Sequence, residues 1–367
     1  MTENANLLDL TDDEDFVDII NMLRNVRRRP QNYRPREDHF LSWNEEDFIK
    51  RFRLSKNGVR YIVNLISDNI RSPTQQNHAL SPEQMVLLTL RFYATGNFLQ
   101  TAGDLIGIDK GTASRIIWKV TQAIAGLYRQ FVRMPQTEEE LREVSQKFYN
   151  VARLPKCCGA IDCTHVKIIS PGGNNAEIYR NRKGFFSLNV QAVCDANCMF
   201  QDVVCRWPGS THDSQIFLNS HIRARCENND FDDYVLVGDS GYAVKKYLIT
   251  PLAEPITRAE QLFNESQIRT RNCIERKFGQ WKRRFPILAF GIRLKLEKDE
   301  AVVIATAVLE NIARLLNEQD PPFDEEGEVA VNFVNDVNIQ PYMNIYNVNN
   351  VNAIVRHQLI NDYFSQL

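Results

Sequence analysis

The sequence predicts an α/β fold for the middle of the chain, with helical regions before and after it. Stretches rich in β-branched residues begin only after Pro155, whereas apolar residues at helical spacing prevail elsewhere. Three expected strands, a helix, a fourth strand and further helices follow one another from there. This order is typical of a sheet covered by helices.

Helices are expected throughout most of the first 150 residues. Residues 12–68 carry apolar side chains at helical spacing, interrupted by two prolines. Ser81 before Pro82 is typical of a helix start, because a serine side chain caps free amides and proline fits the first helical position. We expect that helix to end at Gly96.

Residues 98–120 predict a short helix, a turn at Gly107 and Ile108, and a second helix from about Asp109. This layout is typical of a helix-turn-helix, whose second helix presents its first polar residues to a DNA groove. Arg115 and Lys119 are then candidate DNA contacts. A plain helical hairpin that binds no DNA is the alternative.

The expected strands lie at residues 159–169, 185–194, 199–207 and 234–237, and the expected helices at residues 214–225 and 258–316. We therefore divide the chain into four segments. Residues 1–75 form a helical and basic segment, 76–150 a helix-turn-helix-like helical domain and 151–316 the α/β domain. Residues 317–367 form an acidic, asparagine-rich tail with one helix near residues 353–364.

Composition indicates a soluble globular protein of 367 residues, 43% hydrophobic and 25% charged. No apolar run reaches the roughly 18 residues that a membrane helix needs. The acidic N-terminus does not resemble a secretory leader. The net charge of -2 does not indicate a nucleic-acid binder, but acidic ends mask basic clusters at residues 24–36 and 269–284.

The eight cysteines lie between Cys157 and Cys273 without the paired spacing of a typical zinc site. We interpret them as buried thiols in a reducing compartment, which points to the nucleus or the cytoplasm. A zinc site is the less favoured alternative.

Three acidic residues occupy a restricted pattern. Asp162 lies within the first expected strand, Asp239 ends the fourth, and Glu275 lies on an amphipathic helix. Neighbouring strands bring such carboxylates close together, and their repulsion is relieved by a cation with a preference for oxygen ligands, Mg²⁺ or Mn²⁺. Two such ions support phosphodiester cleavage. Each acid taken alone is more readily explained as a surface or capping residue.

The helix that carries Glu275 has a basic flank suited to a DNA backbone. Ile274, Phe278, Trp281 and Phe285 are expected to form its buried stripe. The candidate phosphate contacts on its remaining face are Arg276, Lys277, Lys282 and Arg283. A solvated basic helix is the alternative.

Other polar residues are weaker candidates. His165 and His212 are able to position water or phosphate, although an isolated histidine is more often structural. Arg182 and Lys183 precede the second strand, where a solvated loop is the favoured interpretation.

Several linked motifs resemble one family. The runs GAIDCTHVKI, RNRKGFFSLNVQAVCD, WPGSTHDSQIF, GDSGY and IERKFGQWKRRFPIL are similar, in this order, to the PIF/Harbinger group of DDE transposases, above all to its domesticated animal members. The resemblance covers about residues 15–316. Cys163 departs from the pattern, since the family often has glycine there.

The resemblance implies an RNase H-like catalytic domain, a divalent metal ion and DNA as substrate. By motif, it assigns metal binding to Asp162, Asp239 and Glu275 and adds Asp213 of the H-D-S motif. It also implies a separate Myb-like DNA-binding protein as partner, and an oligomer is compatible with it. All four acids are present, which favours a nuclease or transposase-type enzyme, and the resemblance to domesticated members implies one without transposition.

Two other functions remain open. A catalytically silent chain with the same fold would act as a DNA- or protein-binding module. A glycosidase also uses paired carboxylates, but the basic surroundings of Glu275 and the lack of an aromatic sugar cleft argue against it.

Overall fold

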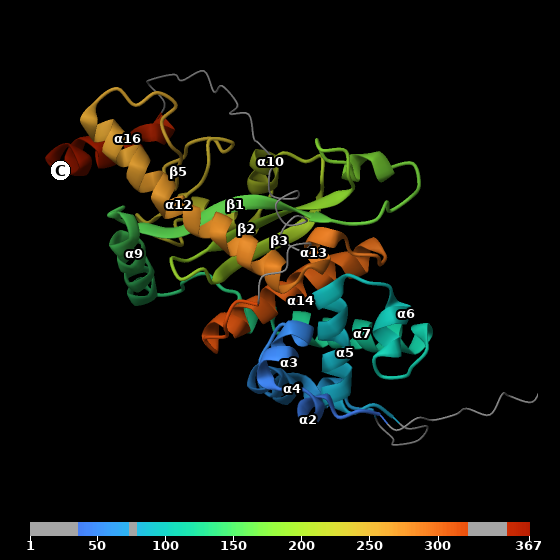
Figure 1. The fold of residues 1–367 in the computed structure, drawn as a ribbon. Coiled ribbons are helices and arrows are strands. Elements are labelled where there is room, and N and C mark those ends of the chain that lie inside the picture. The colour runs from blue at the N-terminus through green and yellow to red at the C-terminus, as the bar shows by residue number, and fades with distance from the viewer. Residues whose placement is uncertain (1–35, 73–78, 322–350) are drawn as a thin grey trace, which may run out of the picture. The chain divides into compact units, whose positions relative to one another are not determined.

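The structure is a computed structural model that describes residues 36–72, 79–321 and 351–367 (Figure 1). Residues Asp38–Leu367 form one compact unit. Residues 12–35 of the expected helical stretch, most of the first basic cluster and most of the acidic tail lie outside the described residues. The division of the chain into domains at residues 75 and 150 stays a prediction. It concerns which segments fold independently, and the compactness of the unit does not decide this.

The N-terminal helices begin and end at residues whose side chains or conformation favour a helix end. Ser81 Oγ accepts the amide of Gln84, and the Gln84 side chain accepts the amide of Ser81, which closes a capping box. Gly96 ends the helix at a φ of 60°, which glycine adopts without strain. Both expected ends are confirmed. The helices are α2 (His39–Ser42), α3 (Glu45–Phe52), α4 (Lys56–Ile70), α5 (Pro82–Thr95), α6 (Leu99–Asp104) and α7 (Lys110–Ala125).

The expected pair of helices around Gly107 is confirmed as α6 and α7. Asp109 caps α7, because its carboxylate accepts the amides of Gly111 and Thr112. A helical pair of this kind is common to many folds, so the DNA-reading role of the pair stays a prediction. Two more helices, α8 (Tyr128–Phe131) and α9 (Glu138–Ala152), lead to the sheet.

The sheet has five strands in the order β3-β2-β1-β4-β5. The strands β1 (Cys157–Lys167), β2 (Ser187–Cys194) and β3 (Phe200–Pro208) are antiparallel neighbours, whereas β4 (Val235–Val237) pairs parallel to β1. The four expected strands are thus present. Sequence analysis missed the fifth, β5 (Leu248–Ile249), which has two residues and no detectable period.

Helices pack on both faces of this mixed sheet. Consecutive residues of a strand point to opposite faces. Accordingly, Ala160 belongs to the hydrophobic cluster that includes α12 and α14, whereas Ile161 belongs to a second cluster with residues of α10 and α11. The even-numbered residues of β1 from Ala160 on therefore face α12, and this places Asp162 on that side.

The expected single helix at residues 214–225 is wrong. Two helices occupy the segment, α10 (Asp213–Leu218) and α11 (His221–Glu227). Ser220 separates them, because its hydroxyl caps α11 by accepting the amide of Arg223 and also donates to the carbonyl of Phe217. The signal in the sequence for this break was the serine in the middle of the expected helix.

The longest helix is α12 (Arg258–Arg284), which carries Glu275 and crosses the sheet (Figure 1). Ile274, Phe278, Trp281 and Phe285 are all buried, which confirms the expected stripe. The chain bends at Pro286 into α13 (Ile287–Phe290) and continues in α14 (Leu296–Leu315).

A fully buried charged cluster joins α12 to α14. Glu310 of α14 accepts hydrogen bonds from Lys277 (3.3 Å) and Arg284 (2.7 Å), and all three side chains are 0% exposed. Burial alone would raise the pKa of the Glu310 carboxyl, but the two cations outweigh it and lower that pKa. Arg284 also donates to the carbonyl of Arg53, just after α3.

The C-terminal residues pack against the start of α12. As expected, residues 353–364 are helical, in α16 (Ile354–Gln358) and the turns on either side of it, Val351–Ala353, Leu359–Tyr363 and Phe364–Gln366. Phe364 contacts Phe263 edge to face, with ring centroids 5.7 Å apart, and Arg356 donates to the carbonyl of Thr250. The described end of the tail is therefore part of the compact unit.

The eight cysteine thiols are unpaired, and seven of them are buried. Among the described residues, no helix combines the length and the apolar character needed to span a membrane.

Candidate active site

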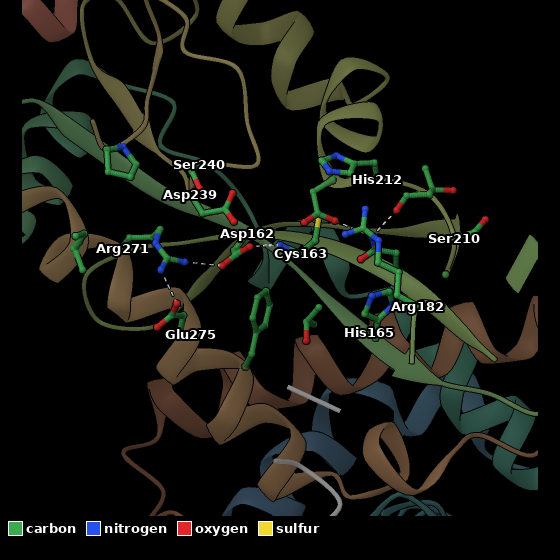
Figure 2. Close-up of a pocket in the computed structure, with 18 residues that line it drawn as sticks. Asp162, Cys163, His165, Arg182, Ser210, His212, Asp239, Ser240, Arg271 and Glu275 are labelled. Atoms are coloured by element: carbon green, nitrogen blue, oxygen red, sulfur yellow. Dashed lines mark hydrogen bonds and ion pairs between the residues drawn. The ribbon is translucent and has the colours of Figure 1, made fainter. Parts of the chain in front are cut away.

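Four acids from separate elements line one cavity of about 620 Å³ (Figure 2). Asp162 comes from β1, Asp213 from the start of α10, Asp239 from the segment after β4, and Glu275 from α12. They are the four carboxylates that sequence analysis singled out. The fold brings them together because β1 and β4 are neighbours and α12 crosses the sheet beside them.

Asp162 is nearly buried at the centre of the cavity. Its Oδ1 accepts the backbone amide of Cys163 (2.8 Å), and its Oδ2 accepts a hydrogen bond from Arg271 (3.0 Å). Burial and the nearby charge of Asp239 raise the pKa of the Asp162 carboxyl well above its usual range, against the opposing effect of Arg271. This carboxylate therefore lacks enough positive charge around it.

Asp239 follows β4 and is held by a turn. The amide of Gly241 donates to its Oδ1 at 3.0 Å, as in an Asx turn. Burial and the charge of Asp213 raise the pKa of Asp239, while Arg271 acts against the shift. Asp239 thus closes a turn, and the turn fixes its carboxylate inside the cavity.

Asp213 is not the cap of α10. His212 takes that position, since its Nδ1 accepts the amide of Ser214 at 3.3 Å. The Asp213 side chain instead accepts a hydrogen bond from Asn189 Nδ2 at 2.8 Å. Asn189 lies on β2, is 2% exposed and leaves its own Oδ1 unbonded within the described structure. It is a site residue that sequence analysis missed, although an asparagine inside an apolar strand was a signal.

Arg271 lies between the acids and was missed as a site residue. Its Nη1 donates to Asp162 and its Nη2 forms an ion pair with Glu275 at 2.6 Å, as the dashed lines in Figure 2 show. Burial alone would lower the pKa of Arg271, but Asp162, Glu275 and Asp239 together raise it. The spacing of four residues between Arg271 and Glu275 on one helix was the available signal.

The acids fit a divalent cation by their chemistry. Carboxylate oxygens are the preferred ligands of Mg²⁺ and Mn²⁺, and the raised pKa values of Asp162 and Asp239 report negative charge without full compensation. In the described arrangement, no three acidic, histidine or cysteine side chains already converge as a finished metal site. Arg271 supplies the positive charge there instead.

Two of the expected DNA contacts on α12 are wrong. Lys277 is buried in the ion pair with Glu310, and Lys282 is buried with its ammonium donating to Thr164 Oγ1 at 2.6 Å. Neither ammonium reaches a phosphate outside the protein, because α12 is covered by the sheet and by α14. Arg276 is exposed and Arg283 is half-buried, so their DNA contacts stay predictions.

Lys119 also has a structural role in place of the expected DNA contact. Its ammonium donates to the carbonyl oxygens of Ile70 (2.7 Å) and Arg71 (3.3 Å), at the C-terminal end of α4. A cation at this end of a helix also interacts favourably with the helix dipole. Arg115 is exposed and donates to Thr112, so its role stays a prediction.

We expect Lys119→Met to lower the free energy of unfolding by about 1–2 kcal/mol, because two helix-terminal carbonyls lose a charged donor. Urea unfolding measures the loss. Arg115→Met removes the same charge from an exposed position on α7 and is expected to change stability by less than about 0.5 kcal/mol. Equal stability of both variants would contradict the structural role of Lys119.

Lys282 makes stability depend on pH. Burial, and next the charge of Lys183, lower the pKa of Lys282 to about 7 from the usual 10.5. Between these values the unfolded chain binds a proton that the folded chain lacks, so stability increases with pH in this window. Lys282→Met is expected to abolish that gain. The check is urea unfolding of both proteins at several pH values from 7 to 10.5, and parallel curves would contradict the prediction.

A known protein family matches the part of the chain that carries the four acids. A family model described as a DDE superfamily endonuclease matches residues 161–311, which span Asp162, Asp213, Asp239 and Glu275. The chain therefore contains a domain of the DDE class, named for its acidic residues.

Individual relatives show which family within the DDE class this chain resembles. The human protein named "Putative nuclease HARBI1" is 34% identical over 272 residues, 73% of this chain and 78% of the relative. The Xenopus laevis protein of the same name is 30% identical over 259 residues, and the Arabidopsis thaliana "Protein ALP1-like" is 25% identical over 308. No solved structure matches the chain. This chain belongs to the Harbinger-derived DDE family.

Proposed function

We propose that this chain is a transposase-derived endonuclease that cleaves DNA phosphodiester bonds with the help of divalent cations, without transposition. The observation that carries the proposal is the convergence of Asp162, Asp213, Asp239 and Glu275 on one cavity. The family agrees with it, since its model is described as an endonuclease and a relative is named as a nuclease.

The strand order supports an RNase H-like catalytic domain. Three antiparallel strands followed by two strands parallel to the first place Asp162 and Asp239 on neighbouring strands. The helix pair α6–α7 would add a DNA contact through Arg115. A nuclear, and also cytoplasmic, location and a separate Myb-like partner belong to the same proposal.

Asp162, Asp239 and Glu275 would hold the cations, with Asp213 beside them. Bound there, two divalent ions would activate the attacking oxygen and stabilise the leaving oxygen of the phosphodiester. Neighbouring residues orient the acids or balance their charge. Asn189 orients Asp213, the Gly241 amide orients Asp239, and Arg271 balances part of the charge of Asp162.

One observation favours a second candidate function. Arg271 bonds both Asp162 and Glu275, so the site is already neutralised in part without a metal ion. A chain that kept this pairing would be catalytically silent and would act as a DNA- or protein-binding module.

Titration with Mg²⁺ and with Mn²⁺ separates the two functions. Full-length protein is incubated with supercoiled and linear DNA in each ion and in chelator, and strand breaks are followed on a gel. Cleavage that appears with the ion and disappears with chelator supports the nuclease. DNA retention in a binding assay, without cleavage at any ion concentration, would favour the binding module.

A further inference from the structure

One end of the cavity carries a guanidinium and lies away from Arg271 and Glu275. Arg182, His165 and Ser210 line that end, and Figure 2 shows them on the opposite side of Asp162 from Arg271. Arg182 is exposed, and within the described part of the chain its side chain forms no ion pair. The four acids therefore occupy only part of the cavity wall.

The turn that carries Arg182 is held by its neighbours. Asn181 is buried and accepts the amides of Lys183 (3.0 Å) and Phe185 (3.3 Å) through its side chain. Arg180 donates to the carbonyl of Gly184 at 2.7 Å, which closes the turn from the other side. Because the turn is already fixed, holding Arg182 at the cavity costs side-chain entropy but little further backbone entropy.

His165 is tied to the same turn. Ser187 Oγ lies 3.1 Å from His165 Nδ1 and 3.2 Å from Asn181 Nδ2, so one hydroxyl links the histidine to the residue before Arg182. Burial, and next the charges of Lys282, Lys183 and Arg182, lower the pKa of His165 to about 4. The histidine is therefore neutral at pH 7, first because it is buried and next because its surroundings are positive.

A cationic end next to a carboxylate cluster suits a substrate with several phosphates. The carboxylates repel a phosphate unless a metal ion lies between them, whereas a guanidinium binds phosphate oxygens directly and in a bidentate manner. A strand of nucleic acid carries a second phosphate beside the one that is cleaved. The two ends of the cavity are therefore suited to two neighbouring phosphates of one strand.

We propose that Arg182, supported by His165, binds a phosphate that flanks the cleaved bond of a DNA strand. The inference rests on the proposed function for the identity of the substrate. It places the path of the strand over the turn before β2, in place of the face of α12 on which Lys277 and Lys282 are buried.

The test measures DNA binding in chelator, so that no result depends on cleavage. Full-length protein binds a fluorescently labelled duplex over a series of salt concentrations. Arg182→Ala is expected to weaken binding roughly tenfold and to lower the slope of log K against log salt by about one unit, the share of one phosphate contact. Arg182→Lys should keep the slope and lose part of the affinity, because an ammonium lacks the bidentate fork.

Arg142→Ala is the matched control. Arg142 is an exposed arginine of α9 that pairs with Glu138 outside the cavity, so its loss changes the net charge equally. If Arg182→Ala and Arg142→Ala bind DNA alike, or if the wild-type protein binds no DNA, the phosphate site is refuted. A protein that binds DNA through Arg182 but never cleaves it would refute the nuclease, and of this inference only the phosphate contact of Arg182 would stand.

Discussion

Asp239→Asn is expected to reduce metal-dependent DNA cleavage by at least about a thousandfold, roughly 4 kcal/mol in activation free energy. The amide has the shape of the carboxylate and is able to keep the hydrogen bond from Gly241, but it carries no charge for a divalent cation. A single-turnover cleavage assay measures the effect.

Thermal unfolding provides a second readout of the same change. Mg²⁺ or Mn²⁺ should raise the melting temperature of the wild-type protein, since a ligand that binds only the folded state stabilises it. Asp239→Asn should show a much smaller increase. Without metal it should be at least as stable as the wild type, because one of several mutually repelling carboxylates is gone.

The control for both assays is Asp233→Asn. Asp233 pairs with Lys156 on the surface, outside the cavity, and its replacement should leave cleavage and metal response unchanged. Cleavage by Asp239→Asn at the wild-type rate would exclude this carboxylate from the catalytic site.

Glu310→Gln is expected to destabilise the protein by about 3–5 kcal/mol, the usual loss when one partner of a buried ion pair is removed. The change leaves Lys277 and Arg284 buried without their anion. Lys277 is able to release its proton, whereas Arg284 is not, so its buried guanidinium keeps only the partly exposed Asp320, 3.4 Å away, as a counter-charge. Urea unfolding followed by circular dichroism measures the loss.

Glu138→Gln is the control for this prediction. It neutralises the same type of residue in an exposed pair with Arg142, where the expected loss is below about 0.5 kcal/mol. A loss below about 1 kcal/mol in Glu310→Gln would mean that solvent reaches the cluster and that it does not hold α12 in place.

Local signals in the sequence were enough to predict much of the fold. Ser81, Gly96 and Asp109 act through contacts within a few residues, so the helix ends that they set were predictable. The four long or apolar strands were predictable from their composition. β5 was not, because two residues paired with a distant strand leave no pattern in the sequence.

The acids of the site were predictable from their motifs, but their surroundings were not. A lysine on an amphipathic helix is normally assigned to solvent, as Lys277 and Lys282 were, because charged side chains are rarely buried. Lys277 is buried against Glu310 of α14 and Lys282 against Thr164 of β1, and both partners are distant in sequence. The one available signal was Glu310, an isolated acid within the apolar run of α14 that requires a buried partner.

The position of α12 also bears on how such a chain is inherited. Its first turns hold Phe364 near the C-terminus through Phe263, and its end is followed by Phe285, which contacts Tyr93 of α5. A gene fragment that encodes only residues 151–316 would leave both ends of this helix uncovered. When such a gene is recruited to a new role in a host, the helices on either side of the catalytic segment are therefore expected to be retained with it, as one evolutionary unit.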